Sequence, residues 1–233
     1  MKKIKAVLFD MDGVIFDTER VYLEDWTKVF EKYGYNMIKE VYISVMGSGR
    51  NNVKDVFRNK FGQELPIEEM YIEKDALLFE AIESNKIPLK EGVIEILDFL
   101  GNNGYKMGLA TSAKRARLDK QLKSASIENK FDTTVSGEDV VNSKPNPDIF
   151  LKAAEKLSVR PEECIVIEDS PAGIRAAYNA GMMGLHVEDL KEADEDILKH
   201  CYKNFKNLIE IHKFIDENIL KHKFQGDAHN NNM

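Results

Sequence analysis

Five short apolar runs recur along the chain, and they constrain its fold more than any other feature of the sequence. Each run ends in polar or turn-forming residues, and helical periodicity fills most of the intervals between them. The runs are AVLFD, YKMGLATS, TTVSGED, CIVIEDS and MGLHVED. Continuous apolar runs of this length are typical of strands covered on both faces, as in a parallel sheet. Their alternation with helices predicts an α/β fold with crossover connections.

Two of the intervals carry residues that typically start and stop helices. In NPDIFLKAAEKL, Asn146 and Pro147 hold the positions of a helix cap and a first turn. In SPAGIRAAYNAG, Ser170 is placed to cap a helix, Pro171 to open it and Gly181 to end it. Both segments are therefore predicted to be helices.

The pattern changes between Thr18 and about Ile87, where amphipathic helices follow one another without a strand. Three segments carry this pattern, VYLEDWTKVFEKYG, NNVKDVFRNKFG and IEEMYIEKDALLFEAIES. Helices inserted after the first strand of an α/β domain predict a small helical cap. The expected division is an α/β core at 1–17 and 88–220, a helical cap at 18–87 and a frayed polar tail at 221–233.

The overall charge and the lengths of the apolar runs exclude some classes of partner. The formal net charge is −7 and the sequence pI is about 5.4, so no surface is indicated for nucleic acid or for anionic lipid. The N-terminal apolar run is too short for a signal peptide, and no window approaches the ~18 apolar residues of a membrane span. We expect a soluble, cytoplasmic protein with Cys164 and Cys201 as free thiols. The sequence gives no indication of oligomeric state.

Polar side chains gather where three of the predicted strands end. They are Asp10 and Asp12 after the first run, Thr111 and Ser112 after the second, and Glu168 and Asp169 after the fourth. Ligands of open α/β sheets bind outside the carboxyl ends of the strands, so we expect these groups to line one cleft. Lys144, just before a predicted helix, is placed to reach the same cleft. An ordinary turn at Asp12 and Gly13 is the alternative account of the first pair.

Four carboxylates in one cleft repel one another, and their pKa values would rise steeply without a cation between them. Oxygen ligands without a nearby His or Cys favour a hard ion, and Mg²⁺ with retained waters fits better than a dedicated calcium cage. An EF-hand loop is excluded, because it needs glycine at its sixth position and Gly13 is fourth from Asp10. The candidate metal ligands are Asp10, Asp12, Glu168 and Asp169.

A metal beside a carboxylate, a hydroxyl pair and a lysine is suited to phosphoryl transfer. The Asp10 carboxylate can accept the phosphoryl group as a nucleophile. Mg²⁺ and Lys144 can offset the charge on the phosphoryl oxygens. A second carboxylate must protonate the leaving oxygen and later deprotonate water, and Asp12 is placed for that role.

With these residues in place, the chain resembles the haloacid dehalogenase superfamily, in the branch whose helical cap follows the first motif. Four motifs carry the resemblance in order, DMDGVIFD, ATS, SKPNPD and IEDS, and it spans about Lys5 to Val187. The resemblance implies a Rossmann-like core and a role for each of six residues. They are Asp10 as nucleophile, Asp12 as general acid/base and metal ligand through its backbone carbonyl, Thr111 as the phosphate-binding hydroxyl, Lys144 as the charge-balancing lysine, Asp169 as a magnesium ligand, and Glu168 as a ligand or its neighbour.

Differences from the family pattern narrow the expected activity. Dehalogenases of the superfamily lack the second aspartate, which is present here as Asp12, and phosphonoacetaldehyde hydrolases need a cap-loop lysine where this chain has Arg50. Phosphomonoester hydrolases and β-phosphoglucomutases remain, and the mutases typically carry a histidine at the position of Tyr22. We therefore expect a Mg²⁺-dependent phosphatase that acts on a small phosphorylated metabolite such as a sugar phosphate, with a mutase as the alternative. A binding module without catalysis is disfavoured, because it has no need of Asp12 or Lys144.

Residues outside the four catalytic positions are candidates for substrate contact. The candidates are Thr18, Gly47, Arg50, Ser112 and Lys114. Arg50 can grip a second phosphate or a sugar hydroxyl when a cap closes, although a solvated arginine at a helix start is an equal account. Thr18 and Glu19 are placed near the cap hinge or the pocket, and a helix cap accounts for Thr18 as well. Lys114 is also explained as an exposed helix lysine.

Two further features favour structural roles. Trp26, with Tyr22 and Phe30 at helical spacing, is expected in the core of the cap. His186 ends a strand-like run without a flanking group that would make it a catalytic base, and it is expected to be structural.

Overall fold

The computed structural model describes residues 3–46 and 50–220, so the substrate-contact candidate Gly47 and the tail expected at 221–233 lie outside the described residues. The strands are β1 (Ala6–Phe9), β2 (Lys106–Ala110), β3 (Thr133–Val135), β4 (Cys164–Glu168), β5 (Met183–Val187) and β6 (Lys203–Phe205). The α-helices are α1 (Thr18–Lys32), α2 (Lys39–Val45), α3 (Arg50–Phe61), α4 (Ile67–Glu83), α5 (Val93–Asn102), α6 (Arg115–Ser124), α7 (Asp148–Lys156), α8 (Pro171–Asn179), α9 (Glu195–His200) and α10 (Leu208–Ile215). Short 3₁₀ turns lie at η1 (Glu128–Lys130), η2 (Gly137–Asp139) and η3 (Pro161–Glu163), and a π-helical turn, η4, at Asp216–Leu220.

The six strands form one parallel sheet in the order β3-β2-β1-β4-β5-β6. All five strands expected from the apolar runs are present, and the expected α/β class is confirmed. The sixth strand, β6, was missed, because it has three residues of which two are polar, Lys203 and Asn204. The strand β1 lies at the centre between β2 and β4, so residues just after β1 are reached from both sides.

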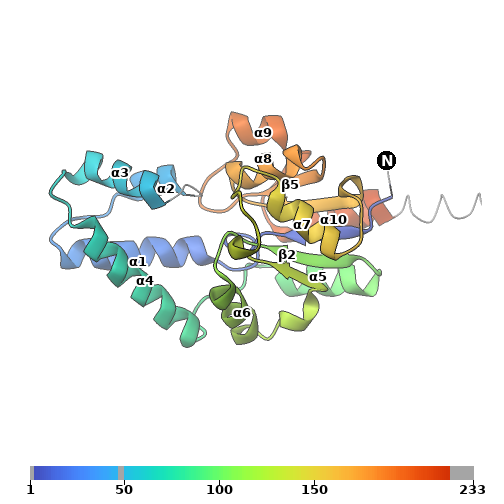
Figure 1. Ribbon diagram of the computed structural model, residues 1–233, viewed down its shortest axis with the longest axis horizontal. Helices are drawn as coiled ribbons and strands as arrows, with labels where there is room; N and C mark the ends of the chain where they lie inside the picture. Colours follow the sequence, from blue (N-terminus) through green and yellow to red (C-terminus); the bar gives the residue numbers. More distant parts are fainter. Residues whose placement is uncertain (1–2, 47–49, 221–233) are drawn as a thin grey trace, which may run out of the picture.

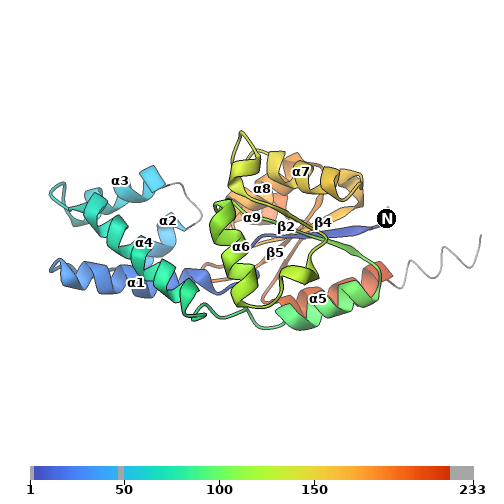
Figure 2. The same ribbon diagram turned by 60° about the horizontal axis from the view of Figure 1, so that its bottom comes forward.

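Alternate residues of β1 face two separate apolar layers. Val7 and Phe9 belong to the layer that includes α5 and α10, whereas Ala6 and Leu8 pack with α7 and α8. All four side chains are fully buried. Figure 2 shows α7 and α8 on one side of the sheet and α5 on the other. Burial on both faces explains why the strand is continuously apolar.

Of the two predicted helix starts, that of α8 is confirmed and that of α7 lies at a different residue. Ser170 accepts a hydrogen bond from the Gly173 backbone N–H at 3.1 Å, and Pro171 begins α8 as expected. The helix α7, in contrast, begins at Asp148 with Pro147 as its N-cap. Asn146 precedes the N-cap and does not cap the helix, and its backbone N–H and side-chain amide both donate to the Ser143 carbonyl of the preceding turn.

Helices α1 to α4 form a lobe beside the sheet (Figure 1), within the segment expected to be a cap. Its core is aromatic, with edge-to-face contacts from Trp26 to Phe57 at 5.2 Å and to Tyr71 at 4.8 Å between ring centroids. Phe30 is fully buried in the same cluster, as expected. The sequence predicted three helices here and missed α2, which has only seven residues with several β-branched ones among them.

Two chain crossings join the lobe to the sheet domain, and they lie side by side. The Asp17 backbone N–H donates to the Pro88 carbonyl at 2.9 Å, and the Lys90 N–H donates to the Ile15 carbonyl at 2.9 Å. The two linkers are therefore hydrogen-bonded to each other. Cys164 and Cys201 are free thiols, as expected. Among residues 3–46 and 50–220, each helix is too short or too polar to cross a bilayer.

Candidate active site

The register of the three central strands determines where the carboxylates of the site lie. Phe9 of β1 lies beside Leu109 of β2 and Ile167 of β4. The next residue, Asp10, donates its backbone N–H to the Ile167 carbonyl at 3.0 Å and so continues the ladder past the strand end. Glu168 is the residue after Ile167, so the two carboxylates emerge at the same level of the sheet.

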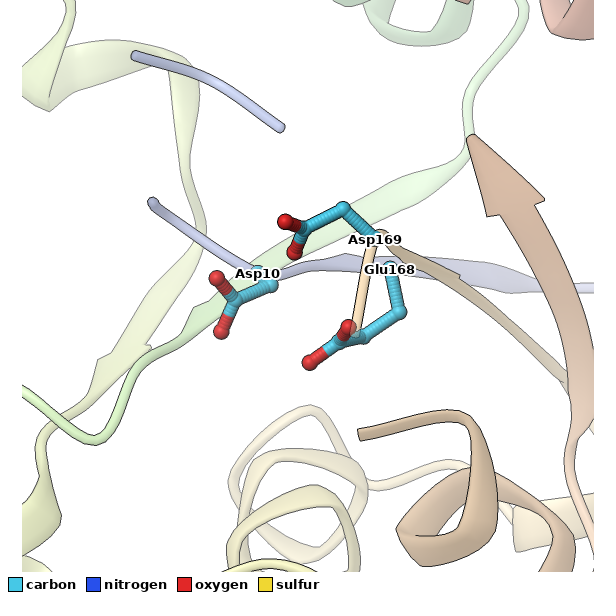
Figure 3. Close-up of side chains that lie close together, drawn as sticks. All are labelled: Asp10, Glu168 and Asp169. Atoms are coloured by element: carbon cyan, nitrogen blue, oxygen red, sulfur yellow. The ribbon is translucent and has the colours of Figure 1, made fainter. Parts of the chain in front are cut away.

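Three carboxyl groups converge at this edge. One oxygen from each of Asp10, Glu168 and Asp169 lies within 4.8 Å of the others, and Figure 3 shows the three groups directed toward a common space. Burial, together with the neighbouring carboxylates, raises the pKa of Asp10 to about 7 against the lowering effect of Lys144. Burial and the charges of Glu168 and Asp10 also raise the pKa of Asp169 well above its usual value. The cluster is electrostatically costly unless cations join it.

Two glycines make room for the acidic side chains. A Cβ on Gly173, in the first turn of α8, would lie 1.6 Å from Glu168 Oε1. A Cβ on Gly13 would lie 2.3 Å from Asp169 Oδ2, and Gly13 also has a φ of +75° that other residues rarely adopt. The glycine of the turn after β1 and the glycine of α8 are thus needed for the geometry of the carboxylates.

Lys144 supplies one cation to the cluster. Its Nζ donates to Glu168 Oε1 at 2.8 Å and to Asp10 Oδ1, and it lies 4.9 Å from the centre of the Phe150 ring. Although burial opposes its charged form, Asp10 and Glu168 hold the pKa of Lys144 above its ordinary value. The lysine therefore remains protonated beside Asp10.

The donor set also suits a divalent metal ion. One lysine facing three carboxylates, those of Asp10 and Glu168 buried and that of Asp169 half-buried, leaves the cluster with an excess of negative charge. Within the described part of the chain, no side chain or backbone group donates a hydrogen bond to the Asp169 carboxylate, so its oxygens are free to bind a cation. Carboxylate oxygens alone favour a hard ion over a soft one.

Asp12 is held apart from the three-carboxylate cluster. Its Oδ1 accepts hydrogen bonds from the Thr18 hydroxyl at 2.7 Å and from the Arg117 guanidinium. Asp17, not Thr18, is the N-cap residue of α1, so the reading of Thr18 as a helix cap is wrong. The sequence analysis missed Arg117, because it is one of three basic residues around the start of α6 and only the orientation of that helix singles it out.

A cavity of about 450 Å³ opens between the sheet edge and the helical lobe. On the sheet side it is lined by Asp10, Asp12, Thr111, Ser112, Ser143, Lys144, Glu168, Asp169, Ser170 and Ala172. On the lobe side it is lined by Glu19, Tyr22, Trp26, Tyr42, Val45, Met46, Arg50, Val53, Tyr71 and Lys74. All four predicted catalytic positions thus face one space.

The five predicted substrate-contact residues have different positions. Arg50 and Ser112 line the cavity, whereas Thr18 contacts Asp12. Lys114 is the N-cap residue of α6 and is not among the residues that line the cavity. Gly47 lies outside the described residues.

The lobe side also carries polar groups that the sequence analysis did not single out. Tyr42 donates its hydroxyl to Glu19 at 2.5 Å, and Lys74 lies 4.4 Å from the centre of the Tyr22 ring. Tyr42 belongs to the missed helix α2, and Lys74 is buried in α4. Neither has a local sequence signal, because their approach to the cavity depends on how the four helices pack.

Comparison with known proteins agrees with this geometry. The sequence profile of the haloacid dehalogenase-like hydrolases matches residues 7–187. The chain belongs to this family. It is 34% identical over 183 residues to a phosphorylated carbohydrates phosphatase of Thermotoga maritima, covering 77% of this chain and 82% of the relative. It is 32% identical over 192 residues to a β-phosphoglucomutase of Bacillus subtilis, covering 79% of this chain and 83% of the relative.

A solved structure shares the whole arrangement. The crystal structure of a β-phosphoglucomutase from Clostridium difficile has a TM-score of 0.72 and 29% identity, covering 95% of this chain and 99% of that one. The Rossmann-like architecture expected from the resemblance is therefore confirmed. The expected family and the expectation of an enzyme are confirmed as well.

Proposed function

We propose that the protein is a Mg²⁺-dependent phosphomonoester hydrolase that works through an aspartyl-phosphate on Asp10. The observation that carries the proposal is the convergence of Asp10, Glu168, Asp169 and Lys144 at the ends of β1 and β4, with Asp12 two residues after Asp10. A nucleophilic carboxylate, a fixed cation and a second carboxylate are the groups that phosphoryl transfer requires.

The reaction proceeds in two steps, transfer of the phosphoryl group to Asp10 and hydrolysis of the aspartyl-phosphate. A carboxylate oxygen of Asp10 attacks the phosphorus, the bond from phosphorus to the leaving oxygen breaks, and Asp12 gives that oxygen a proton. Water then attacks the phosphorus of the aspartyl-phosphate while Asp12 accepts a proton from it, which releases inorganic phosphate and restores Asp10. Thr111 and Lys144 bind the phosphoryl oxygens during both steps.

Asp10, Glu168 and Asp169, with the backbone carbonyl of Asp12, are the proposed ligands of the metal. A bound Mg²⁺ would offset negative charge on the transferring phosphoryl group. Arg117 and Thr18 orient the Asp12 carboxyl, which must change its proton twice in each turnover.

The substrate class is proposed to be a phosphorylated carbohydrate. The Thermotoga maritima relative named for this activity supports the class, and a cavity of about 450 Å³ can hold a monosaccharide phosphate. A cytoplasmic location, and the lack of a nucleic-acid or membrane partner, remain predictions of the sequence.

A phosphosugar mutase is the second candidate. It is favoured by the similarity to the β-phosphoglucomutases of Bacillus subtilis and Clostridium difficile and by Arg50 in the cavity wall. It is opposed by Tyr22, which lines the cavity where such mutases typically carry a histidine.

The test is to incubate the purified protein with Mg²⁺ and a panel of sugar phosphates, and to measure both free phosphate and isomerised product. The panel includes β-glucose 1-phosphate with a bisphosphate primer, and p-nitrophenyl phosphate as a generic ester. We expect free phosphate as the main product and loss of turnover in EDTA that Mg²⁺ restores. Glucose 6-phosphate formed without matching phosphate release would replace the hydrolase with the mutase. If no ester is turned over, the remaining hypothesis is a binding module without catalysis.

A further inference from the structure

Glu19 holds a carboxylate in the lobe side of the cavity, away from the phosphoryl chemistry. It is the second residue of α1, it is half-buried, and it lines the cavity. The two-step reaction proposed above uses Asp10 and Asp12 and leaves Glu19 without a role.

One oxygen of Glu19 is occupied and the other is not. Oε2 accepts the hydrogen bond from the Tyr42 hydroxyl at 2.5 Å. Within residues 3–46 and 50–220, no donor reaches the second carboxylate oxygen. Burial raises the pKa of Glu19 to about 7, against the lowering effect of the Tyr42 hydrogen bond. Because Glu19 lines the cavity, a ligand that fills the cavity would displace water from this side chain, and a donor from the ligand would replace the lost hydrogen bond.

The cations on the lobe side are already neutralised. Arg50 and Lys74 both contact the carboxylate of Asp75, at 2.6 and 2.9 Å. Arg50 also lies over the Tyr71 ring, 4.6 Å from its centre. Among the described residues that line this side, Arg50 and Lys74 are the cations and Glu19 is the carboxylate, and Asp75, which does not line the cavity, pairs with both cations. A second phosphate on the substrate would enter a region with no surplus positive charge and would approach Glu19.

Resting on the proposed phosphatase activity, we infer that Glu19 recognises the leaving group: its carboxylate accepts a hydrogen bond from a hydroxyl of a carbohydrate or polyol that carries a single phosphate. Tyr42 holds the carboxylate in place, so the free oxygen keeps a fixed direction. Glu19 is thus a specificity-determining residue, and the charge balance of the wall disfavours bisphosphates.

The experiment compares kcat/KM of the wild-type enzyme and of Glu19→Gln with Mg²⁺ present. The substrates are monosaccharide and polyol monophosphates, the matching bisphosphates, and p-nitrophenyl phosphate, which has no aliphatic hydroxyl. We expect the best monophosphate to exceed its bisphosphate by about 10-fold or more. Glu19→Gln should lower kcat/KM for that monophosphate by about 10- to 100-fold, and for p-nitrophenyl phosphate by less than about 3-fold.

Deoxy analogues of the best substrate separate recognition from support of the fold. Removing the hydroxyl that Glu19 binds should lower kcat/KM of the wild type by about 10-fold. The same removal should lower kcat/KM of Glu19→Gln by less than about 3-fold, because the variant has already lost that contact. Glu31→Gln, an exposed change on the same helix, is the matched control and should leave every substrate unchanged. Tyr42→Phe keeps the Glu19 carboxylate, so it should lower kcat/KM for the monophosphate by less than Glu19→Gln does. It should likewise affect the monophosphate more than p-nitrophenyl phosphate.

Equal losses of kcat/KM in Glu19→Gln on the sugar phosphate and on p-nitrophenyl phosphate would overturn the inference. A bisphosphate as the best substrate would also overturn it, as would deoxy analogues that lower kcat/KM of the wild type and of Glu19→Gln by the same factor. These outcomes leave the proposed hydrolase intact. A wild-type enzyme that hydrolyses none of the esters would instead overturn the proposed function and this inference with it.

Discussion

The two sides of the cavity are built by different means. On the sheet side, Asp10 and Glu168 stand directly after Phe9 and Ile167, which lie side by side in the ladder. Hydrogen bonds of the central strands therefore place the carboxylates, and Gly13 and Gly173 leave the space that their side chains fill. The chemistry on this side depends on backbone register.

On the lobe side, the polar groups come from separate helices. Glu19 lies on α1, Tyr42 on α2, Arg50 on α3 and Lys74 on α4. Edge-to-face contacts from Trp26 join α1, α3 and α4, and α2 packs on the same cluster through Tyr42 and Val45. The contrast teaches that phosphoryl transfer and leaving-group recognition depend on two separable sets of contacts, so a change in one set should leave the other largely intact.

The largest expected effect comes from the aromatic core of the lobe. Phe57 is fully buried against Trp26 and Phe30, so Phe57→Ala should lower the free energy of unfolding by about 3–5 kcal/mol. Chemical denaturation measures this loss. KM for the best sugar phosphate should rise while kcat for p-nitrophenyl phosphate stays near the wild-type value. An equal loss on both substrates would contradict the separation of the two sides. Phe79→Ala, at an exposed position of α4, is the control.

A smaller effect is expected at the glycine beside Glu168. Gly173→Ala places a Cβ where Glu168 Oε1 lies, and the required shift should cost about 1–3 kcal/mol in unfolding free energy and lower kcat for every ester. Gly101→Ala on α5 is the matched helical control, because its Cβ would meet only Met107 Cε at 3.6 Å. Denaturation and steady-state kinetics measure both variants. Full activity in Gly173→Ala would show that the position of Glu168 is unimportant.

Arg117 tests whether the orientation of Asp12 limits the rate. Arg117→Gln removes the guanidinium from Asp12 Oδ1 and should lower kcat for sugar phosphates by about 10-fold with KM changed less than about 3-fold. Arg117→Lys should restore part of kcat. A KM effect without a kcat effect would assign Arg117 to substrate binding instead. Lys123→Gln, exposed on the same helix, should change neither constant.

The smallest effect concerns the sheet domain away from the cavity. Hydrogen bonds from the Ser136 N–H and hydroxyl, with Arg115 nearby, lower the pKa of Asp139 to about 2. A lowered pKa stabilises the fold above the ordinary value near 3.8, and this contribution is lost as the pH falls toward 2. Allowing for partial exposure, Asp139→Asn should lower the free energy of unfolding at pH 7 by roughly 1 kcal/mol.

Denaturation curves of this variant between pH 2 and 7 provide the check. The difference from the wild type should shrink below pH 4 and vanish near pH 2, while catalysis at pH 7 is unchanged. A difference that is constant with pH would reject the assignment. Asp55→Asn, exposed on α3, is the control.

The sequence predicted the sheet side well and the lobe side poorly. Apolar runs locate strands, and parallel strands share an edge, so the meeting of Asp10 with Glu168 follows from local pattern alone. Tyr42 reaches Glu19 only because a seven-residue helix docks on the aromatic core, and no periodicity reveals that docking. Arg117 likewise reaches Asp12 across 105 positions of sequence. Such contacts arise from tertiary packing, which a single sequence does not display.

The central claim is that Asp10 becomes phosphorylated during turnover. The direct measurement is to quench the working enzyme in acid, reduce the trapped acyl phosphate with borohydride, and locate the resulting homoserine by mass spectrometry of peptides. We predict homoserine at position 10 in the wild type, and none in Asp10→Asn. Homoserine at Asp12 or at another residue, or steady turnover by Asp10→Asn, would contradict the account.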